Sequence, residues 1–193
     1  MKLIFATNNK HKIREISDLL DDRFEIIGLA DVGITEDIPE DADNLADNAL
    51  LKARYVHKRT GMNVFADDTG LEVDALDGAP GVHSARYAGA SKSPDDNIIK
   101  LLKELEGVED RKARFRTVVA LIYDNSEYLF EGKVEGGIIQ KRRGSGGFGY
   151  DPVFVAEGND LTFAEIPLSE KNKISHRARA MNKLLAFLAQ QPV

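Results

Sequence analysis

The sequence of 193 residues contains no cysteine and no tryptophan. Without cysteine the chain can form neither disulfide bonds nor thiolate metal sites, which is typical of a protein from a reducing compartment, and we expect a cytoplasmic one. No apolar run reaches the roughly 20 residues that a transmembrane helix needs. The first residues, MKLIFATNNK, also lack the pattern of a secretory signal peptide. We therefore expect no association with a membrane.

An excess of basic residues is also lacking, because 32 Asp and Glu outnumber 26 Lys and Arg and give a net charge of -6. A dedicated nucleic-acid-binding protein normally has a basic surface, so we expect no nucleic-acid partner. Between positions 31 and 48 there are seven acidic residues and no Lys or Arg, whereas positions 171 to 183 carry five Lys or Arg. These segments either face each other across a metal and a polyanion or form two solvated surfaces.

The remaining composition, 42% hydrophobic and 30% charged residues, is typical of a globular protein. A chain of this length forms one domain or two lobes that share a core. The turn-prone Asp124-Asn125-Ser126 separates two long β-rich runs, 113–123 and 127–140, and predicts an antiparallel hairpin. The predicted fold class is therefore α/β, with a mixed β-sheet and flanking helices. A further short strand is predicted at 162–166.

The stretch from Phe65 to Gly89 contains two adjacent carboxylates, Asp67 and Asp68, directly after a short apolar run. The run predicts a buried strand with both carboxylates at its end, followed by Thr69-Gly70. Neighbouring residues of a strand point to opposite faces, so only one carboxylate can face a given cleft. Acidic residues at strand ends hold a divalent metal or act as a general base in hydrolases. The same residues also fit a solvated turn.

A polar loop from Thr7 to Lys12, TNNKHK, follows the first β-rich run and precedes a helical pattern. Such a loop offers free backbone amides and the positive end of the helix dipole to an anion such as phosphate. Lys10 and Lys12 add positive charge, although the glycines of a P-loop are missing. Capping of the helix by Asn8 or Asn9 explains the same residues without a ligand.

A glycine-rich loop at 142–152, RRGSGGFGYDP, carries Phe148 and Tyr150. Its glycines permit close backbone approach and positive φ, at an entropic cost that a simple connection would not need. The two rings offer flat surfaces on which a base can stack, and a hairpin loop with incidental aromatics is the alternative. In the C-terminal segment, His176 and Arg177 fall in the first turn of a predicted helix, where cations are unfavourable unless an anion is bound.

Six motifs in this order closely resemble those of the Ham1/RdgB family of inosine/xanthosine triphosphate pyrophosphatases: TNNKHK, NALLKAR, FADDTGL, GAPGVHSARYAG, GGFGYDPVF and KNKISHRARA. The resemblance covers nearly the whole chain. It implies a single ITPase-like domain, residues 1–193, with an elongated mixed sheet and two lobes around a central nucleotide cleft, usually assembled as a homodimer. It also implies Mg²⁺-dependent hydrolysis of ITP, dITP and XTP to the monophosphate and pyrophosphate, which removes deaminated purines from the nucleotide pool.

The resemblance also implies a set of site residues. Asp68 matches the proton acceptor and metal ligand, and Glu40 matches a second metal-binding carboxylate. Phe148 to Asp151 match the base-binding loop, and Thr69 stands where Ser is common. The full set of predicted substrate-binding residues is Thr7, Asn8, Asn9, Lys10, His11, Lys12, Lys52, Thr69, Phe148, Gly149, Tyr150, Asp151, Lys171, His176 and Arg177.

The expected chemistry is attack of water on the α-phosphorus, with Asp68 orienting or deprotonating the water. Discrimination would centre on the 6-keto group of hypoxanthine or xanthine, against the 6-amino group of adenine. One alternative is a phosphatase that releases orthophosphate. Another is a non-catalytic nucleotide sensor or an RNA-binding module, which would bind its ligand without magnesium-dependent turnover.

Overall fold

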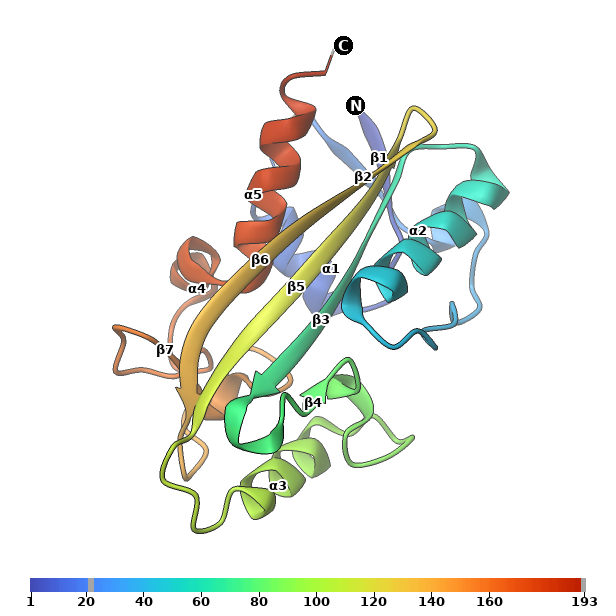
Figure 1. The fold of residues 1–193 in the computed structure, drawn as a ribbon. Helices are drawn as coiled ribbons and strands as arrows, with labels where there is room; N and C mark the ends of the chain where they lie inside the picture. The colour runs from blue at the N-terminus through green and yellow to red at the C-terminus, as the bar shows by residue number, and fades with distance from the viewer. Residues whose placement is uncertain (21–22, 192–193) are drawn as a thin grey trace. The chain divides into compact units, whose positions relative to one another are not determined.

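A computed structural model describes residues 1–20 and 23–191 of the chain (Figure 1). Strands and α-helices alternate in the first part of the sequence, the two longest strands follow each other as a hairpin, and two α-helices end the chain, with short 3-10 helices in several connections. The strands are β1 Lys2–Phe5, β2 Glu25–Ile27, β3 Val64–Val73, β4 Pro80–Gly81, β5 Lys112–Tyr123, β6 Ser126–Ile138 and β7 Phe154–Ala156. The α-helices are α1 Lys10–Ser17, α2 Leu45–Thr60, α3 Pro94–Glu104, α4 Leu168–Ile174 and α5 His176–Leu188. None of the described helices is both long and apolar enough to cross a membrane.

The strands pair in the order β2-β1-β3-β5-β6-β7, and β4 pairs with β3 beside this path. β1 is parallel to β2 and to β3, whereas β4 is antiparallel to β3 and β7 is antiparallel to β6. A two-residue turn joins β5 to β6, and its residues Asp124 and Asn125 have φ of 49° and 59°. Such positive angles are typical of hairpin turns. The predicted mixed α/β class is therefore confirmed.

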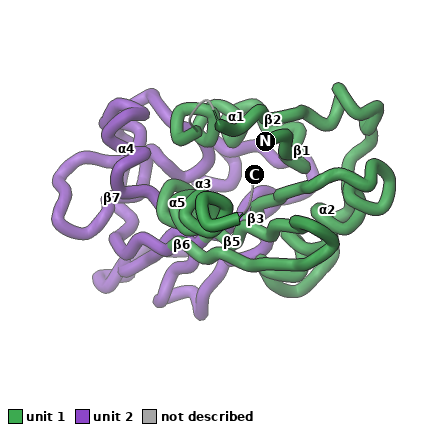
Figure 2. Tube along the Cα trace, turned by 90° about the horizontal axis from the view of Figure 1, so that it is seen from above, with its two compact units in different colours: residues 1–68, 117–132, 177–193 green, residues 69–116, 133–176 purple. Residues whose placement is uncertain are grey.

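The chain divides into two compact units (Figure 2). Unit 1 comprises residues 1–68, 117–132 and 177–193, and unit 2 comprises residues 69–116 and 133–176. The boundaries fall inside β3, β5, β6 and α5, so these elements contribute residues to both units. Buried hydrophobic side chains form two clusters in unit 1 and one in unit 2 among the described residues.

In unit 1, the side chains of β3 alternate between two buried clusters. Val64 belongs to the cluster that contains Ala53 of α2. Phe65 belongs to the cluster that contains Met181 of α5, and its ring stacks on that of Phe5 with centroids 4.5 Å apart. Because strand side chains alternate in direction, the following odd and even positions of β3 continue these two faces. This alternation decides which helices can contact each of the two aspartates.

The sequence-based prediction that the two aspartates end a strand is wrong. β3 continues to Val73, so both carboxylates lie in its interior. Thr69-Gly70 has the composition of a turn, but β4 supplies an antiparallel partner to this part of the strand. A Cβ atom at Gly70 would lie 2.6 Å from the carbonyl oxygen of Gly81, so glycine here permits close approach of the two chains.

The prediction of a strand at 162–166 is also wrong. Of these residues Thr162 forms an isolated bridge with Val155, and the segment does not continue as a strand. The strand of this region is β7, which directly follows the glycine-rich motif and was not predicted. In unit 2, β7 contributes Phe154 to a core shared with Leu101 of α3 and Phe115 of β5.

Candidate active site

Asp67 and Asp68 are buried, with 1% and 8% of their surface exposed. Asp67 lies on the same face of β3 as Phe65, and Asp68 lies on the same face as Val64. The partners of the two carboxylates differ accordingly. Helices α1 and α5 provide cations for Asp67, whereas α2 provides the partners of Asp68.

Asp68 interacts with two side chains of α2. Its Oδ2 accepts a hydrogen bond of 3.1 Å from Nδ2 of Asn48, and its Oδ1 lies 3.9 Å from Nζ of Lys52. Asn48 and Lys52 are four residues apart and therefore share one face of the helix. Burial raises the pKa of Asp68, because the loss of hydration outweighs the attraction of Lys52 and Lys12. A carboxylate with a raised pKa is a stronger proton acceptor.

Glu40 lies in the acidic segment before α2 and forms an ion pair with the same Lys52. Its side chain is 34% exposed. Desolvation acts to raise the pKa of Glu40, but the charge and the hydrogen bond of Lys52 prevail and lower it. Asn48 also accepts a hydrogen bond of 3.0 Å from the backbone of Ala42, which attaches the acidic segment to α2. Glu40 and Asp68 thus both approach one ammonium group.

Two carboxylates that approach one cation have the oxygen donors that Mg²⁺ prefers. Within residues 1–20 and 23–191, no group of three or more His, Asp or Glu side chains forms a metal site. Mg²⁺ is commonly held by one or two carboxylates together with substrate phosphates and water. Glu40 and Asp68 fit a site of this kind.

Asp67 interacts with cations from both α1 and α5. Its Oδ1 lies 3.0 Å from Nζ of Lys12, and its Oδ2 accepts a hydrogen bond of 3.2 Å from Nε of Arg177. Its backbone carbonyl accepts hydrogen bonds of 2.7 Å from Lys52 and 3.3 Å from Lys12. Burial opposes ionisation, yet the charges of Lys12 and Arg177 hold the pKa of Asp67 well below its usual range. Asp67 is therefore the anion around which several cations of unit 1 gather.

Arg177 and His176 occupy the first turn of α5, as the sequence predicts. The unfavourable position of these cations indicated a bound anion. In the structure, Arg177 is 1% exposed and donates hydrogen bonds to the carboxylates of Glu15 and Asp67. The protein itself therefore supplies anions to this helix N-terminus, and the role of Arg177 in binding substrate stays a prediction.

The N-terminus of α1 is capped by Asn9. Its Oδ1 accepts hydrogen bonds from the backbone amides of His11 and Lys12, at 2.9 and 3.3 Å. The capping interpretation is thus confirmed for Asn9, and the phosphate-binding role of the loop stays a prediction. The other predicted residues of this segment are at least partly exposed: Thr7, Asn8, Lys10 and His11.

In unit 2, the glycine-rich loop folds around the carboxylate of Asp151. Its Oδ2 accepts a hydrogen bond of 2.8 Å from the backbone of Phe148 and lies 2.6 Å from Nζ of Lys171. Gly147 has φ of 68°, and a Cβ atom there would lie 2.1 Å from this same Oδ2. The loop therefore needs glycine at this position. Nζ of Lys171 also lies 5.2 Å from the ring centroid of Phe148, within cation–π range.

The aromatic residues predicted to bind the base differ in accessibility. Phe148 is partly exposed, whereas Tyr150 is 4% exposed and its hydroxyl donates a hydrogen bond of 2.9 Å to the carbonyl of Ser84. His176 is also buried and stacks on Phe115, with centroids 4.5 Å apart. Phe148 is thus available for stacking, while Tyr150 belongs to the core. Thr69 and Gly149 are partly exposed.

Sequence reasoning missed Asn48 and Glu15 as members of the site and left the role of Asp67 open. The position of Asn48, four residues before Lys52, was the available signal, since both lie on one helical face. Glu15 follows Lys12 by three residues on α1, which is also a helical spacing. Neither spacing alone indicates what the side chain contacts.

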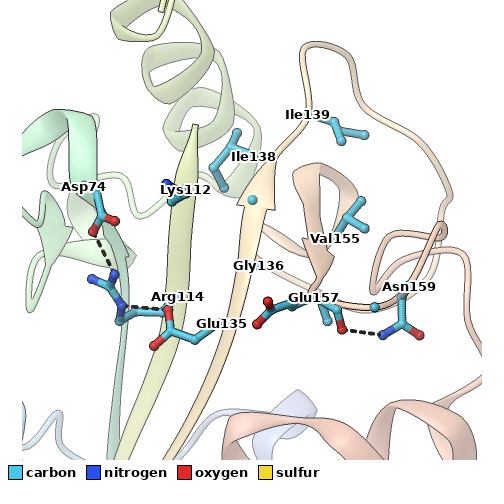
Figure 3. Close-up of a pocket in the computed structure, with 13 residues that line it drawn as sticks. Asp74, Lys112, Arg114, Glu135, Gly136, Ile138, Ile139, Val155, Glu157 and Asn159 are labelled. Carbon is cyan, nitrogen blue, oxygen red and sulfur yellow. Dashed lines mark hydrogen bonds and ion pairs between the residues drawn. The ribbon is translucent and has the colours of Figure 1, made fainter. Parts of the chain in front are cut away.

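A pocket of about 580 Å³ lies in unit 2 on the surface of β5, β6 and β7 (Figure 3). Arg114 at its wall forms ion pairs with Asp74 and Glu135, at 2.8 and 2.9 Å. Among the described residues that line this pocket, none belongs to the predicted site. The pocket is therefore not lined by the residues that carry the candidate chemistry.

Comparisons with known proteins place the chain in a family. The sequence model of the Ham1 family matches residues 3–187. A protein of Porphyromonas gingivalis named dITP/XTP pyrophosphatase is 61% identical over 188 residues, covering 97% of each chain. The solved Ham1 protein of Staphylococcus aureus is 39% identical with a TM-score of 0.89, covering 98% of each chain. A HAM1 protein of Coxiella burnetii is 37% identical with a TM-score of 0.91, covering 99% of this chain and 100% of its own. This chain belongs to the Ham1 family.

Proposed function

We propose that this protein is a nucleoside triphosphate pyrophosphohydrolase that converts dITP, ITP and XTP to the monophosphate and pyrophosphate. The observation that carries the proposal is the buried Asp68, whose pKa is raised and which shares Lys52 with Glu40. The name dITP/XTP pyrophosphatase, given to a relative that is 61% identical, supports this choice of substrate. The protein would thereby remove deaminated purines from the nucleotide pool.

The cations of unit 1 suit the triphosphate part of the substrate. The side chains of Lys12 and Lys52 are 14% and 7% exposed. Charges with little exposure to water interact more strongly than surface charges. Desolvation disfavours the charged form of Lys52, but Asp68 and Glu40 prevail and raise its pKa. Lys52 therefore stays protonated and can offset the charge that develops on the leaving pyrophosphate.

In the proposed reaction, the oxygen of a water molecule forms a bond to the α-phosphorus. The bond from this phosphorus to the bridging oxygen breaks, pyrophosphate leaves, and the proton of the water passes to the carboxylate of Asp68. Asn48 orients that carboxylate through its hydrogen bond to Oδ2. Glu40 and Asp68 would hold Mg²⁺, which when bound neutralises phosphate charge.

Residues of unit 2 suit recognition of the base. Phe148 offers a ring for stacking, and Lys171 and His176 offer hydrogen-bond donors. The ammonium group of Lys171 carries three donors, so it can retain Asp151 and still donate to a 6-keto oxygen. The 6-amino group of adenine would face this donor with another donor, and a mismatch of this kind rejects a substrate strongly. We therefore assign the selection against ATP to this set.

We also propose that the enzyme acts as a cytoplasmic homodimer. The resemblance of the chain to its family supports the dimer, and the absence of cysteine suits a reducing compartment. Light scattering on the purified protein should give twice the mass of the chain. A monomer mass at working concentration would contradict the assembly without affecting the proposed reaction.

The test of the reaction is incubation with ITP, dITP, XTP, ATP and GTP in the presence of Mg²⁺, with the products identified by mass spectrometry. We expect a monophosphate and pyrophosphate from the first three and far slower turnover of ATP. Release of orthophosphate with a nucleoside diphosphate would contradict the proposal, as would binding without turnover. Removal of the metal by a chelator should abolish turnover, and added Mg²⁺ should restore it.

A further inference from the structure

Asp67 takes no part in the reaction proposed above, yet cations from three helices contact it. Lys12 of α1 lies at one of its carboxylate oxygens and Arg177 of α5 at the other, at 3.0 and 3.2 Å. Lys52 of α2 donates to its backbone carbonyl, at 2.7 Å. The three cationic side chains are between 2% and 14% exposed. Several cations that are expected to bind the triphosphate therefore all contact Asp67.

Buried cations that gather around one point repel each other unless an anion lies among them. A buried charge that loses its partner is strongly unfavourable, so the side chain turns toward water or its helix shifts. The side chain of Asp67 is fully buried and presents one oxygen to Lys12 and the other to Arg177. Each of the two cations therefore loses a carboxylate partner when the side chain of Asp67 is changed.

Because side chains alternate along β3, the contacts of Asp67 with the cations lie on the opposite face from Asp68, the proposed proton acceptor. Asp68 faces α2 and contacts Asn48, whereas Asp67 faces α1 and α5. A change of the Asp67 side chain also leaves its backbone carbonyl, and so the contacts of Lys52 and Lys12 with this oxygen, in place. Asn has the shape of Asp but presents an NH₂ group to one of the two cations.

We propose that Asp67 is a positioning residue that holds Lys12 and Arg177 in the conformation in which they bind the triphosphate. The inference rests on the proposed function. It predicts that substitution of Asp67 acts through these cations. A misplaced substrate-binding group can cost roughly 100-fold in rate. We therefore expect Asp67→Asn to lower kcat/KM for ITP by roughly this factor and to raise KM as well.

The experiment is a double-mutant cycle on ITP hydrolysis with Asp67→Asn and Lys12→Met. If Asp67 acts through Lys12, Asp67→Asn costs much less activity when Lys12 is already Met. The matched control is Lys58→Met, the same chemical change at an exposed position on α2 that is not among the predicted site residues. In the Lys58→Met background, Asp67→Asn should cost as much as in the wild type.

If Asp67→Asn costs the same activity in the Lys12→Met background as in the wild type, the inference is overturned. A lower kcat at unchanged KM would also overturn it, because a smaller folded fraction produces that result. If Asp67→Asn does not fold, Asp67→Glu, which keeps the charge but moves the carboxylate, enters the same cycles with the same expectations. Calorimetric binding of inorganic tripolyphosphate without metal repeats the cycle independently of turnover. A wild-type protein that releases no pyrophosphate would reject the proposed function, while the binding cycle would still decide the role of Asp67.

Discussion

The ammonium group of Lys171 lies 2.6 Å from the carboxylate of Asp151, and each side chain is 3% exposed. Replacing Lys171 by Met removes one partner of this buried pair and leaves an uncompensated carboxylate. Such a change typically costs about 3–5 kcal/mol. We expect Lys171→Met to lower the free energy of unfolding by about this amount. Urea denaturation followed by circular dichroism measures it.

The control is the double variant Lys171→Met/Asp151→Asn, which removes both charges. The asparagine introduced in that protein is neutral and needs no ion-pair partner, and its amide oxygen can still accept the backbone hydrogen bond of Phe148. The double variant should therefore be more stable than Lys171→Met alone. Losses that simply add would show that the two charges do not stabilise one another.

Gly147 and Gly149 provide a matched pair in the glycine-rich loop. Both have positive φ, 68° and 60°, so alanine is strained at either position. A Cβ atom meets Asp151 at Gly147 but nothing within 4 Å at Gly149. We expect Gly147→Ala to displace the loop and raise KM for ITP several-fold more than Gly149→Ala. Equal KM values in steady-state assays would contradict the proposed dependence of base binding on this loop.

Local sequence patterns predicted those elements whose structure depends mainly on neighbouring residues. The hairpin at Asp124-Asn125 and the helix capped by Asn9 follow from turn and capping chemistry. The end of β3 did not follow, because Thr69-Gly70 has the composition of a turn, and only the pairing of β4 with the next two residues continues the strand. Pairing with a distant segment overrides the local preference of a strand.

The candidate site shows the same limit at longer range. Asn48 and Lys52 are related by a helical spacing that the sequence displays. Asp67 and Arg177 are separated by 110 positions, and no local pattern connects them. The cation at the start of α5 did predict a nearby anion, but only the structure identifies Asp67 and Glu15 as anions of the protein itself.

Asp68→Asn tests the proposed proton acceptor. The asparagine oxygen can keep a hydrogen bond to Asn48, so the variant should fold and give the circular dichroism of the wild type. General-base catalysis contributes roughly 10²–10⁴-fold, and we expect kcat for ITP to fall by a factor in this range. Near-normal kcat would remove Asp68 from its role. The control is Ala42→Gly, a change in the acidic segment before α2 that keeps the backbone donor to Asn48, and this variant should retain most of the activity.

Tyr150 links the base-binding loop to the pH dependence of stability. Burial, reinforced by the charges of Tyr87 and Glu104, raises the pKa of Tyr150 well above its ordinary value of 10.0. In the unfolded chain the phenol ionises near its ordinary pKa, while in the folded protein it stays protonated. Its contribution to stability is therefore complete below pH 10.0 and is lost progressively as the pH rises above this value.

Tyr150→Phe removes both this linkage and the hydrogen bond to the carbonyl of Ser84. Below pH 10.0 we expect the variant to be less stable by about 1 kcal/mol, the usual net value of such a bond. Above that pH the wild type loses stability through ionisation of its unfolded state, and the variant does not lose this contribution, so the difference should shrink. Urea denaturation on both sides of this pH measures the change. A difference that stays constant with pH would show that the phenol of Tyr150 is not shielded from ionisation by the fold.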